Sequence, residues 1–281
     1  MNPDKLAAIV MLVTLTFGAG LQVNREHLIE ILKNLRLLGR ALLANFVIVP
    51  ILGVFLARLF ALPSEIATGY LLMAIAPGVP FVLINVRKRG GSLGLAVALA
   101  LFLPLLSVFT VPLTARLVLP TEATAQLPVG QFFVTLLLFQ SLPLLAGIIV
   151  AYRLPANALK LARLSHILFL VSVLGLLILL APKFAAGVGA VYGSHGMWAM
   201  LCIVVLSLVT GWLLGGPLSD DRRVLSIGTA LRNIGLCALV ATTSFPETLV
   251  APTVLTYFLL QFVLVMIVGV YFTRTAAREP A

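Results

Sequence analysis

The stretch LRNIGLCALVATTSF, residues 231–245, contains a single charged residue, Arg232, within a run that otherwise has the composition of a membrane helix. The nearest charged residue before it is Arg223, nine positions earlier. At about 1.5 Å of rise per helical residue, Arg232 would lie about 14 Å deep, near the bilayer centre. A guanidinium at that depth costs roughly 3 kcal/mol, so the fold must supply it with a partner.

The composition of the whole chain indicates a membrane protein. Hydrophobic residues make up 61% of the 281 positions and charged residues only 10%, which excludes an ordinary soluble domain. Apolar runs continue over roughly 20 residues without alternating, which favours helices over a barrel. The expected fold is therefore all-α, a polytopic membrane protein of about nine transmembrane helices that form one transporter domain over residues 1–281.

The apolar segments are separated by clusters of charged residues. The first segment lacks a basic start and a cleavage site, so we interpret it as a retained span and not as a signal peptide. The nine predicted spans are Lys5–Val23, Ala41–Leu62, Ser64–Val86, Ser92–Val118, Leu127–Tyr152, Leu164–Pro182, Gly196–Gly215, Val224–Phe245 and Leu249–Phe272.

The distribution of lysine and arginine predicts the orientation of the chain. Fourteen of the nineteen basic residues fall on one side of the predicted topology, four on the other, and the remaining one is Arg232. Because basic residues favour the cytoplasm, we expect the N-terminus outside, the C-terminus in the cytoplasm and the protein in the cell (inner) membrane. The formal net charge of +10 is then explained by topology and by contact with the lipid bilayer, without nucleic-acid binding.

Two predicted spans carry signals for an interrupted helix. In the third, Pro77, Gly78 and Pro80 fall within four residues, where proline removes helical hydrogen-bond donors. In the eighth, glycine, threonine and asparagine residues surround Arg232. The two interruptions are five spans apart, an odd number, which predicts an inverted repeat with copies at about 1–119 and 127–273. Paired interrupted helices of this kind are typical of the binding site of a secondary transporter.

The acidic residues provide no counter-charge for Arg232 within the membrane. All nine lie at or beyond the ends of the predicted spans: Asp4, Glu26, Glu30, Glu65, Glu122, Asp220, Asp221, Glu247 and Glu279. Backbone carbonyls, a polar side chain such as Asn45, water or an external anion remain as partners. An anionic substrate suits a guanidinium well, but a cation that only locks two broken helices together through their carbonyl ends is a second interpretation.

Other polar residues within the spans carry weaker signals. Gln140, Ser141 and Gln261 are expected to make hydrogen bonds between helices. The sequence contains no motif for a nucleophile, a phosphate loop or a metal site, so we predict a protein that is not an enzyme and that needs no cofactor and no metal. The oligomeric state is left open.

Four motifs resemble the bile acid:sodium symporter family over nearly the whole chain: TFGAGLQV (16–23), ANFVIVP (44–50), LPSEIATGYLLMAIAPG (62–78) and IGTALRNIGLCALVATTSF (227–245). The resemblance implies a nine-span form of two inverted five-helix repeats, divided into a core domain and a panel domain. It also implies that two discontinuous helices cross in the core, and that an organic anion binds beside this crossing.

The sequence departs from the family at the positions that ligate sodium. The resemblance places Val82 and Leu83 where the family has small polar ligands, Gly228 where it has a glutamate, and Arg232 where it has a glutamine. Asn45 replaces a further glutamine. A sodium site needs several oxygen ligands, so we expect sodium to be absent and Arg232 to supply the positive charge in its place.

The predicted function is therefore transport of a small organic anion by alternating access, without sodium coupling. The alternatives are a sodium-coupled symporter with relocated ion sites and a transport-inactive paralogue that binds ligand. The predicted substrate-binding residues are Arg232, Asn233, Thr229, Pro77, Gly78, Pro80, Asn45 and Asn85.

Overall fold

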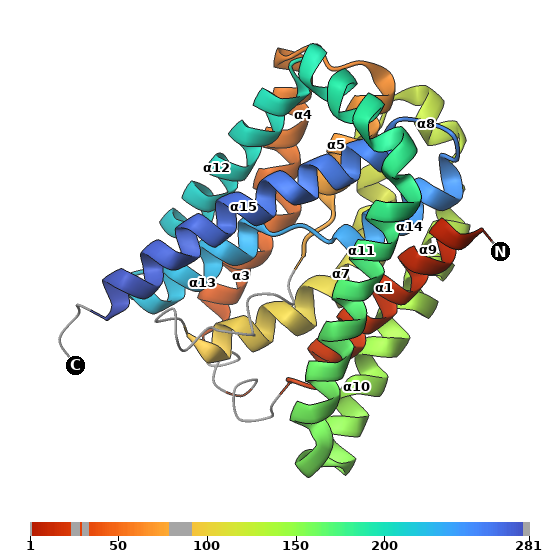
Figure 1. Cartoon of the computed structure of the whole chain (residues 1–281). Coiled ribbons are helices and arrows are strands. Elements are labelled where there is room, and N and C mark those ends of the chain that lie inside the picture. The colour runs from red at the N-terminus through yellow and green to blue at the C-terminus, as the bar shows by residue number, and fades with distance from the viewer. Residues whose placement is uncertain (1, 24–28, 30–33, 79–91, 278–281) are drawn as a thin grey trace.

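The structure is a computed structural model that describes residues 2–23, 29, 34–78 and 92–277, with the side chains of residues 183 and 186 left aside. All regular secondary structure in these ranges is helical, as predicted (Figure 1). The elements are α1 (Pro3–Gly20), α3 (Leu35–Leu43), η1 (Ala44–Ile48), α4 (Val49–Leu59), α5 (Ser64–Ile75), α7 (Leu93–Val118), α8 (Thr121–Ala125), α9 (Val129–Leu136), η3 (Leu137–Ser141), α10 (Leu142–Arg153), α11 (Pro155–Gly193), α12 (Gly196–Leu214), α13 (Ser219–Ala230), α14 (Ile234–Ser244) and α15 (Val250–Ala276).

Within the described residues, seven helices are long and apolar enough to cross a membrane. The predicted third and eighth spans are not among them, because α5 has only 12 residues and the eighth span is divided into α13 and α14. The span predicted at Leu164–Pro182 lies within α11, a continuous helix of 39 residues that extends beyond both predicted ends. A helix of that length measures about 58 Å, so it extends beyond the roughly 30 Å of hydrocarbon. The limits of an apolar segment indicate where the chain enters and leaves the membrane, but they do not indicate where the helix begins and ends.

Two of the long helices contain a π-helical turn. The α3, η1 and α4 segments form one helix with its π turn at Ala44–Ile48, and α9, η3 and α10 form another with its π turn at Leu137–Ser141. Each π turn comes just before a proline, Pro50 or Pro143. A proline cannot donate to the preceding turn and its ring crowds that turn, which a π turn relieves. The turns carry Asn45 and Gln140, both fully buried.

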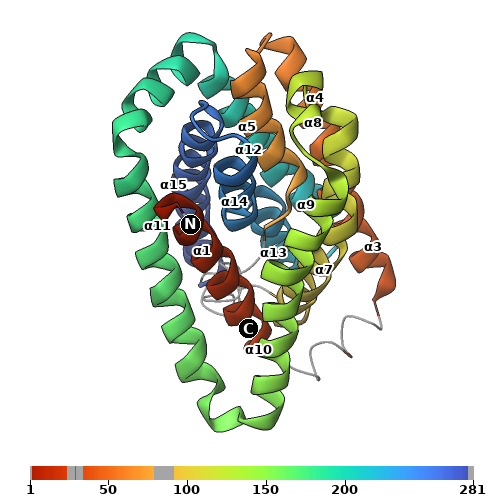
Figure 2. The same ribbon diagram turned by 90° about the vertical axis from the view of Figure 1, so that its right-hand side faces the viewer.

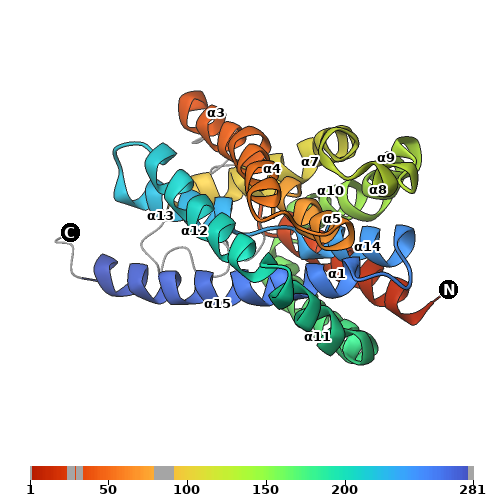
Figure 3. The same ribbon diagram turned by 90° about the horizontal axis from the view of Figure 1, so that it is seen from above.

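Helix α1 packs against α10, α11 and α14, and the joined ends of α10 and α11 extend below the other helices (Figure 2). The backbones of α1 and α10 approach at Gly20 and Gly147. A Cβ atom at Gly147 would lie 2.3 Å from the Phe17 carbonyl oxygen, and one at Gly20 would lie 2.1 Å from that of Leu144. Side chains larger than hydrogen at these positions would therefore separate the helices. Helix α15 runs alongside α13 and α14 in the view from above (Figure 3).

The glycine contact between α1 and α10 gives a stability prediction. Gly147→Ala should lower the free energy of unfolding by about 2 kcal/mol, because the added methyl group meets main-chain atoms that have little room to move. Thermal unfolding of the detergent-purified protein measures the change. Gly175→Ala is the matched control, since a Cβ there has no atom within 4 Å. Equal stability of the two variants would show that α1 and α10 do not approach as described.

Candidate functional site

Two non-helical segments meet in the middle of the molecule. Helix α5 ends at Ile75, and the chain between α13 and α14 is also not helical. Pro77 and Arg232 pair across these segments as an isolated antiparallel β-bridge. The predicted interruption around Arg232 is thus confirmed, and so is the end of the helix at Pro77 and Gly78. Pro80, the third residue of the predicted interruption, lies outside the described residues.

Main-chain hydrogen bonds hold the two segments together. The Gly78 amide donates to the Leu231 carbonyl at 3.1 Å, and the Asn233 amide donates to the Ala76 carbonyl at 3.0 Å. A Cβ atom on Gly78 would lie 2.4 Å from the carbonyl carbon of Arg232. Glycine is therefore required at position 78 by the close approach of the second segment. We call this junction, Ala76–Gly78 with Leu231–Asn233, the crossing.

A side chain from α15 bonds both main-chain groups of Arg232, whose carbonyl also accepts from the Ile234 amide at 3.0 Å. The Arg232 amide donates to Gln261 Oε1 at 3.1 Å, and Gln261 Nε2 donates to the Arg232 carbonyl at 3.4 Å. An amide side chain can donate and accept at the same time. Gln261 therefore makes the two kinds of hydrogen bond that neighbouring turns would make to Arg232 if it lay within a helix. The expectation that Gln261 bonds between helices is confirmed.

The guanidinium of Arg232 lies at the C-terminal end of α13. Its Nη2 atom donates to the Thr229 carbonyl at 2.7 Å, and the residue is only 3% exposed. The last carbonyls of a helix have no partner within that helix and carry partial negative charge, which favours a cation there. No acidic residue in the described ranges forms an ion pair with Arg232. A backbone carbonyl is thus one of the partners that the sequence left open.

Asn233 begins the helix on the other side of the crossing. Its Oδ1 atom accepts from the Leu236 amide at 3.1 Å and caps α14, while its Nδ2 atom donates to Gln140 Oε1 at 2.9 Å. Gln140 in turn donates to the Pro104 carbonyl of α7 at 2.8 Å. The predicted bond from Gln140 to another helix is confirmed, and this chain of bonds connects the crossing to both α7 and the π turn of η3.

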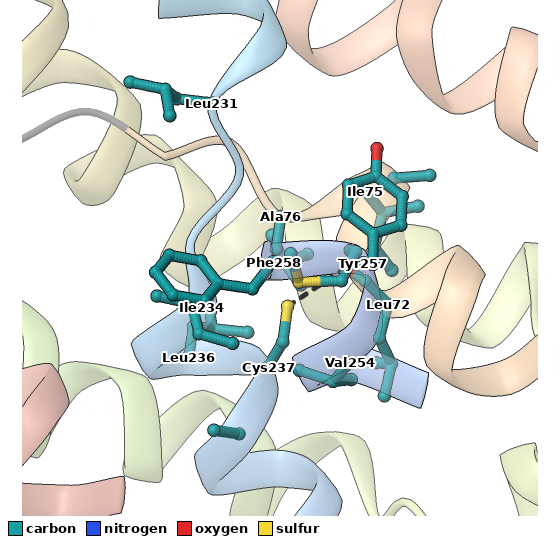
Figure 4. Packing of buried hydrophobic residues seen from close by; sticks show 14 of the residues in the cluster. Leu72, Ile75, Ala76, Leu231, Ile234, Leu236, Cys237, Val254, Tyr257 and Phe258 are labelled. Carbon is teal, nitrogen blue, oxygen red and sulfur yellow. Dashed lines mark hydrogen bonds between the residues drawn. The ribbon is translucent and has the colours of Figure 1, made fainter. Parts of the chain in front are cut away.

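Apolar side chains surround the crossing on the side of α5 and α15 (Figure 4). Leu72 and Ile75 come from α5, Leu236 and Cys237 from α14, and Tyr257 from α15. The Cys237 thiol donates to the Leu72 carbonyl at 3.3 Å, which agrees with its interpretation as a small buried residue. Charge interactions are stronger in apolar surroundings of this kind than in water.

The structure brings together five of the eight predicted site residues: Arg232, Asn233, Thr229, Pro77 and Gly78. Asn45 is fully buried on η1, where its amide donates to the Ala41 carbonyl of its own helix and not to a group of the crossing. Asn85 lies outside the described residues.

None of the predicted substrate-binding residues belongs to a stripe of buried polar residues on α15, of which only Gln261 was singled out from the sequence. Thr253, Tyr257 and Gln261 follow one another at intervals of four on this helix, and all three are fully buried. This spacing puts them on one face of the helix, and Gln261 directs that face toward the crossing. The interval of four residues can be read from the sequence, but it does not show which part of the protein this face of α15 contacts.

A cavity of about 260 Å³ lies between α1, α9 and α14, away from Arg232. One cation, Lys5, lines it together with polar side chains of α9 and α14, among them Gln131, Thr135 and Thr243. None of the predicted substrate-binding residues lines this cavity.

The sequence is similar to that of known proteins over most of its length. The Sodium Bile acid symporter family matches residues 9–194. A protein of Bacillus subtilis (strain 168), "Uncharacterized sodium-dependent transporter YocS", is 26% identical over 253 residues, 87% of this chain and 76% of that protein. The P3 proteins of Bos taurus and Homo sapiens are each 25% identical over 83% of this chain, which spans 50% of their length.

The Gln261 contact gives a second prediction. Gln261→Met should destabilise the protein by about 2 kcal/mol, because the buried amide of Arg232 loses its acceptor. Gln126→Met, at an exposed position, should leave stability unchanged. The thermal unfolding midpoints of the two purified variants provide the comparison. A Gln261→Met midpoint equal to that of Gln126→Met would show that Gln261 does not support the crossing.

Proposed function

The chain belongs to the Sodium Bile acid symporter family, and we propose that it transports small organic anions across the cell membrane by alternating access without coupling to sodium. The observation that carries this proposal is Arg232, a buried cation at the crossing of two interrupted segments. Family resemblance places this residue where related transporters hold a glutamine beside bound sodium. A covalently attached charge makes a bound cation unnecessary there.

An anionic substrate follows from the chemistry of a buried guanidinium. Arg232 makes one hydrogen bond to a carbonyl, and its Nε and Nη1 atoms have no protein partner among the described residues. These two donors suit a carboxylate or a sulfonate. We propose that Asn233 and Thr229 contribute to the same site and that Pro77, Gly78 and Pro80 shape it. Asn45 and Asn85 are proposed as supporting polar groups.

The architecture proposed for the transporter is a nine-span inverted repeat. The seven helices of the described residues that are long and apolar enough to cross a membrane support seven of these spans, and the interrupted third and eighth segments would supply the other two. The repeats would cover about 1–119 and 127–273, with a core around the crossing and a panel that includes α1, α10 and α11. We further propose that the N-terminus lies outside and the C-terminus in the cytoplasm, from the distribution of basic residues.

The cavity that contains Lys5 is proposed as the outer entrance for substrate. It lies between α1 and α9 of the proposed panel and α14 of the proposed core. Its volume of about 260 Å³ suits a small organic acid. Lys5 would attract such an acid electrostatically, and rocking of the panel against the core would then open a route to Arg232.

A sodium-coupled symporter with relocated ion sites is the second candidate. It is favoured by the printed name of the Bacillus subtilis relative, a sodium-dependent transporter. In that case the ion would bind oxygen atoms away from Arg232. A third candidate, a transport-inactive paralogue, is favoured by the main-chain bonds of the crossing, from Gly78 to Leu231 and from Asn233 to Ala76, because these contacts can hold the two interrupted segments in one arrangement.

Counterflow in proteoliposomes tests the proposal. A panel of carboxylates and sulfonates is first screened by thermal stabilisation of the purified protein, in sodium and in choline. The acid that stabilises most is then loaded into proteoliposomes, and exchange of its radiolabelled form is measured. Equal exchange in the two cations is the expected result. Exchange that requires sodium supports the second candidate, and stabilisation without exchange supports the third.

Substitution of the arginine gives a third prediction. Arg232→Gln should reduce counterflow about tenfold or more, since a charge-assisted hydrogen bond contributes roughly 1.5 to 3 kcal/mol. Arg163→Gln removes the same charge from an exposed position on α11 and should retain wild-type exchange. Wild-type exchange by a folded Arg232→Gln variant would remove Arg232 from the mechanism.

A further inference from the structure

The cavity that contains Lys5 ends close to the crossing. On η3 its lining reaches Phe139, and the next residue of the chain is Gln140. On α14 its lining reaches Leu239, which is six residues from Asn233 at the start of that helix. Six helical residues correspond to about 9 Å, so fewer than two turns of α14 separate the cavity from the crossing.

Helix α1 closes one side of this interval. Leu12 lies two turns along α1 from Lys5, and a Cβ atom on Gly235 would lie 2.9 Å from the Leu12 Cα atom. The main chains of α1 and α14 are therefore in contact there and leave no passage between them. The direct route that remains from the cavity to the crossing runs between η3 and α14, which both line the inner end of the cavity.

A hydrogen bond between two side-chain amides joins η3 to α14 on this route. Asn233 Nδ2 donates to Gln140 Oε1 at 2.9 Å, and Gln140 is fully buried. The amide nitrogen of Gln140 donates to two groups of α7, the Pro104 carbonyl at 2.8 Å and Ser107 Oγ at 2.6 Å. Because α7 holds the nitrogen of Gln140, the oxygen of this side chain is directed at Asn233.

The bond between Gln140 and Asn233 can break without disrupting the helices that it joins. A hydrogen bond between neutral amides exchanges its partner for water with only a small change in free energy. Asn233 Oδ1 accepts from the Leu236 amide, so α14 stays capped when Nδ2 changes its partner. A carboxylate accepts more strongly than an amide oxygen, and an anion that arrives from the cavity can therefore take the Nδ2 donor from Gln140.

We propose that Gln140 is the gating residue between the cavity that contains Lys5 and the crossing. Its bond to Asn233 closes the route in this conformation, and transfer of the Asn233 Nδ2 donor to the carboxylate of the substrate opens it. Gln140 is a positioning residue, since it controls access to the site through Asn233. The inference rests on the proposed function for the ligand that opens the gate, whereas the closed contact does not depend on that function.

Thiol labelling measures the opening without any transport assay. Both native cysteines are replaced by alanine, and one cysteine is introduced at Leu236, which is fully buried and lies one turn inward of Leu239 and Val240 on the same face of α14. A charged methanethiosulfonate reagent is added to sealed vesicles on the side from which it labels Thr243→Cys in the cavity. Gln140→Leu should accelerate labelling of Leu236→Cys about fivefold or more, because the reagent reaches this position only when the gate is open.

Further variants separate gating from a general loss of structure. Asn233→Ser keeps a side-chain oxygen that can cap α14 and removes the amide donor, so it should accelerate labelling of Leu236→Cys as Gln140→Leu does. It also keeps the proposal testable if Gln140→Leu does not fold. Ser107→Ala removes another partner of Gln140 but leaves the bond to Asn233, and it should label at the wild-type rate. Thr243→Cys should react equally fast in every background.

Two results would overturn the proposal. One is a rate of labelling at Leu236→Cys that neither Gln140→Leu nor Asn233→Ser changes. The other is an equal acceleration by Ser107→Ala, which would mean that any loosening of the buried hydrogen bonds exposes this position. Faster labelling of the two gate variants in a protein that exchanges no organic anion would support the gate and overturn only the proposed function.

Discussion

A guanidinium buried at the point where two chain segments stop being helical is the constraint on which this molecule depends. An interrupted helix leaves carbonyl and amide groups without partners, and a charge in a membrane requires compensation. In this protein the unpaired carbonyl groups and the buried charge partly compensate each other. The Thr229 carbonyl at the end of α13 accepts from Arg232, and the crossing provides the main-chain bonds that the interrupted helices lack.

The rest of the fold keeps that arrangement in place. Gln261 holds the Arg232 main chain from α15, and Asn233 caps α14 while it bonds to the π turn that carries Gln140. These bonds reach three different helices, so a movement of any one of them alters the surroundings of Arg232. A transporter needs such coupling, because its site must change when one bundle of helices moves against another.

Family membership and site chemistry contribute different parts of the functional conclusion. The match over residues 9–194 establishes the family of transporters. It does not settle the coupling ion, since the eighth span carries Gly228 and Arg232 at positions where the resemblance implies a glutamate and a glutamine. The replacement of a bound cation by a covalently attached one is the physical basis for proposing anion transport without sodium.

The sequence alone was sufficient for the membrane class, the break of the helix at Arg232, the end of a helix before Pro77 and the absence of an acidic residue in the segment around Arg232. These features depend on composition and on local backbone chemistry, such as proline and glycine in mid-segment. Only the tertiary structure decided which groups surround Arg232. Gln261 lies 29 positions from Arg232, Gln140 lies 93 from Asn233, and Leu72 lies 165 from Cys237. Such contacts depend on how helices pack, and no local pattern specifies that packing.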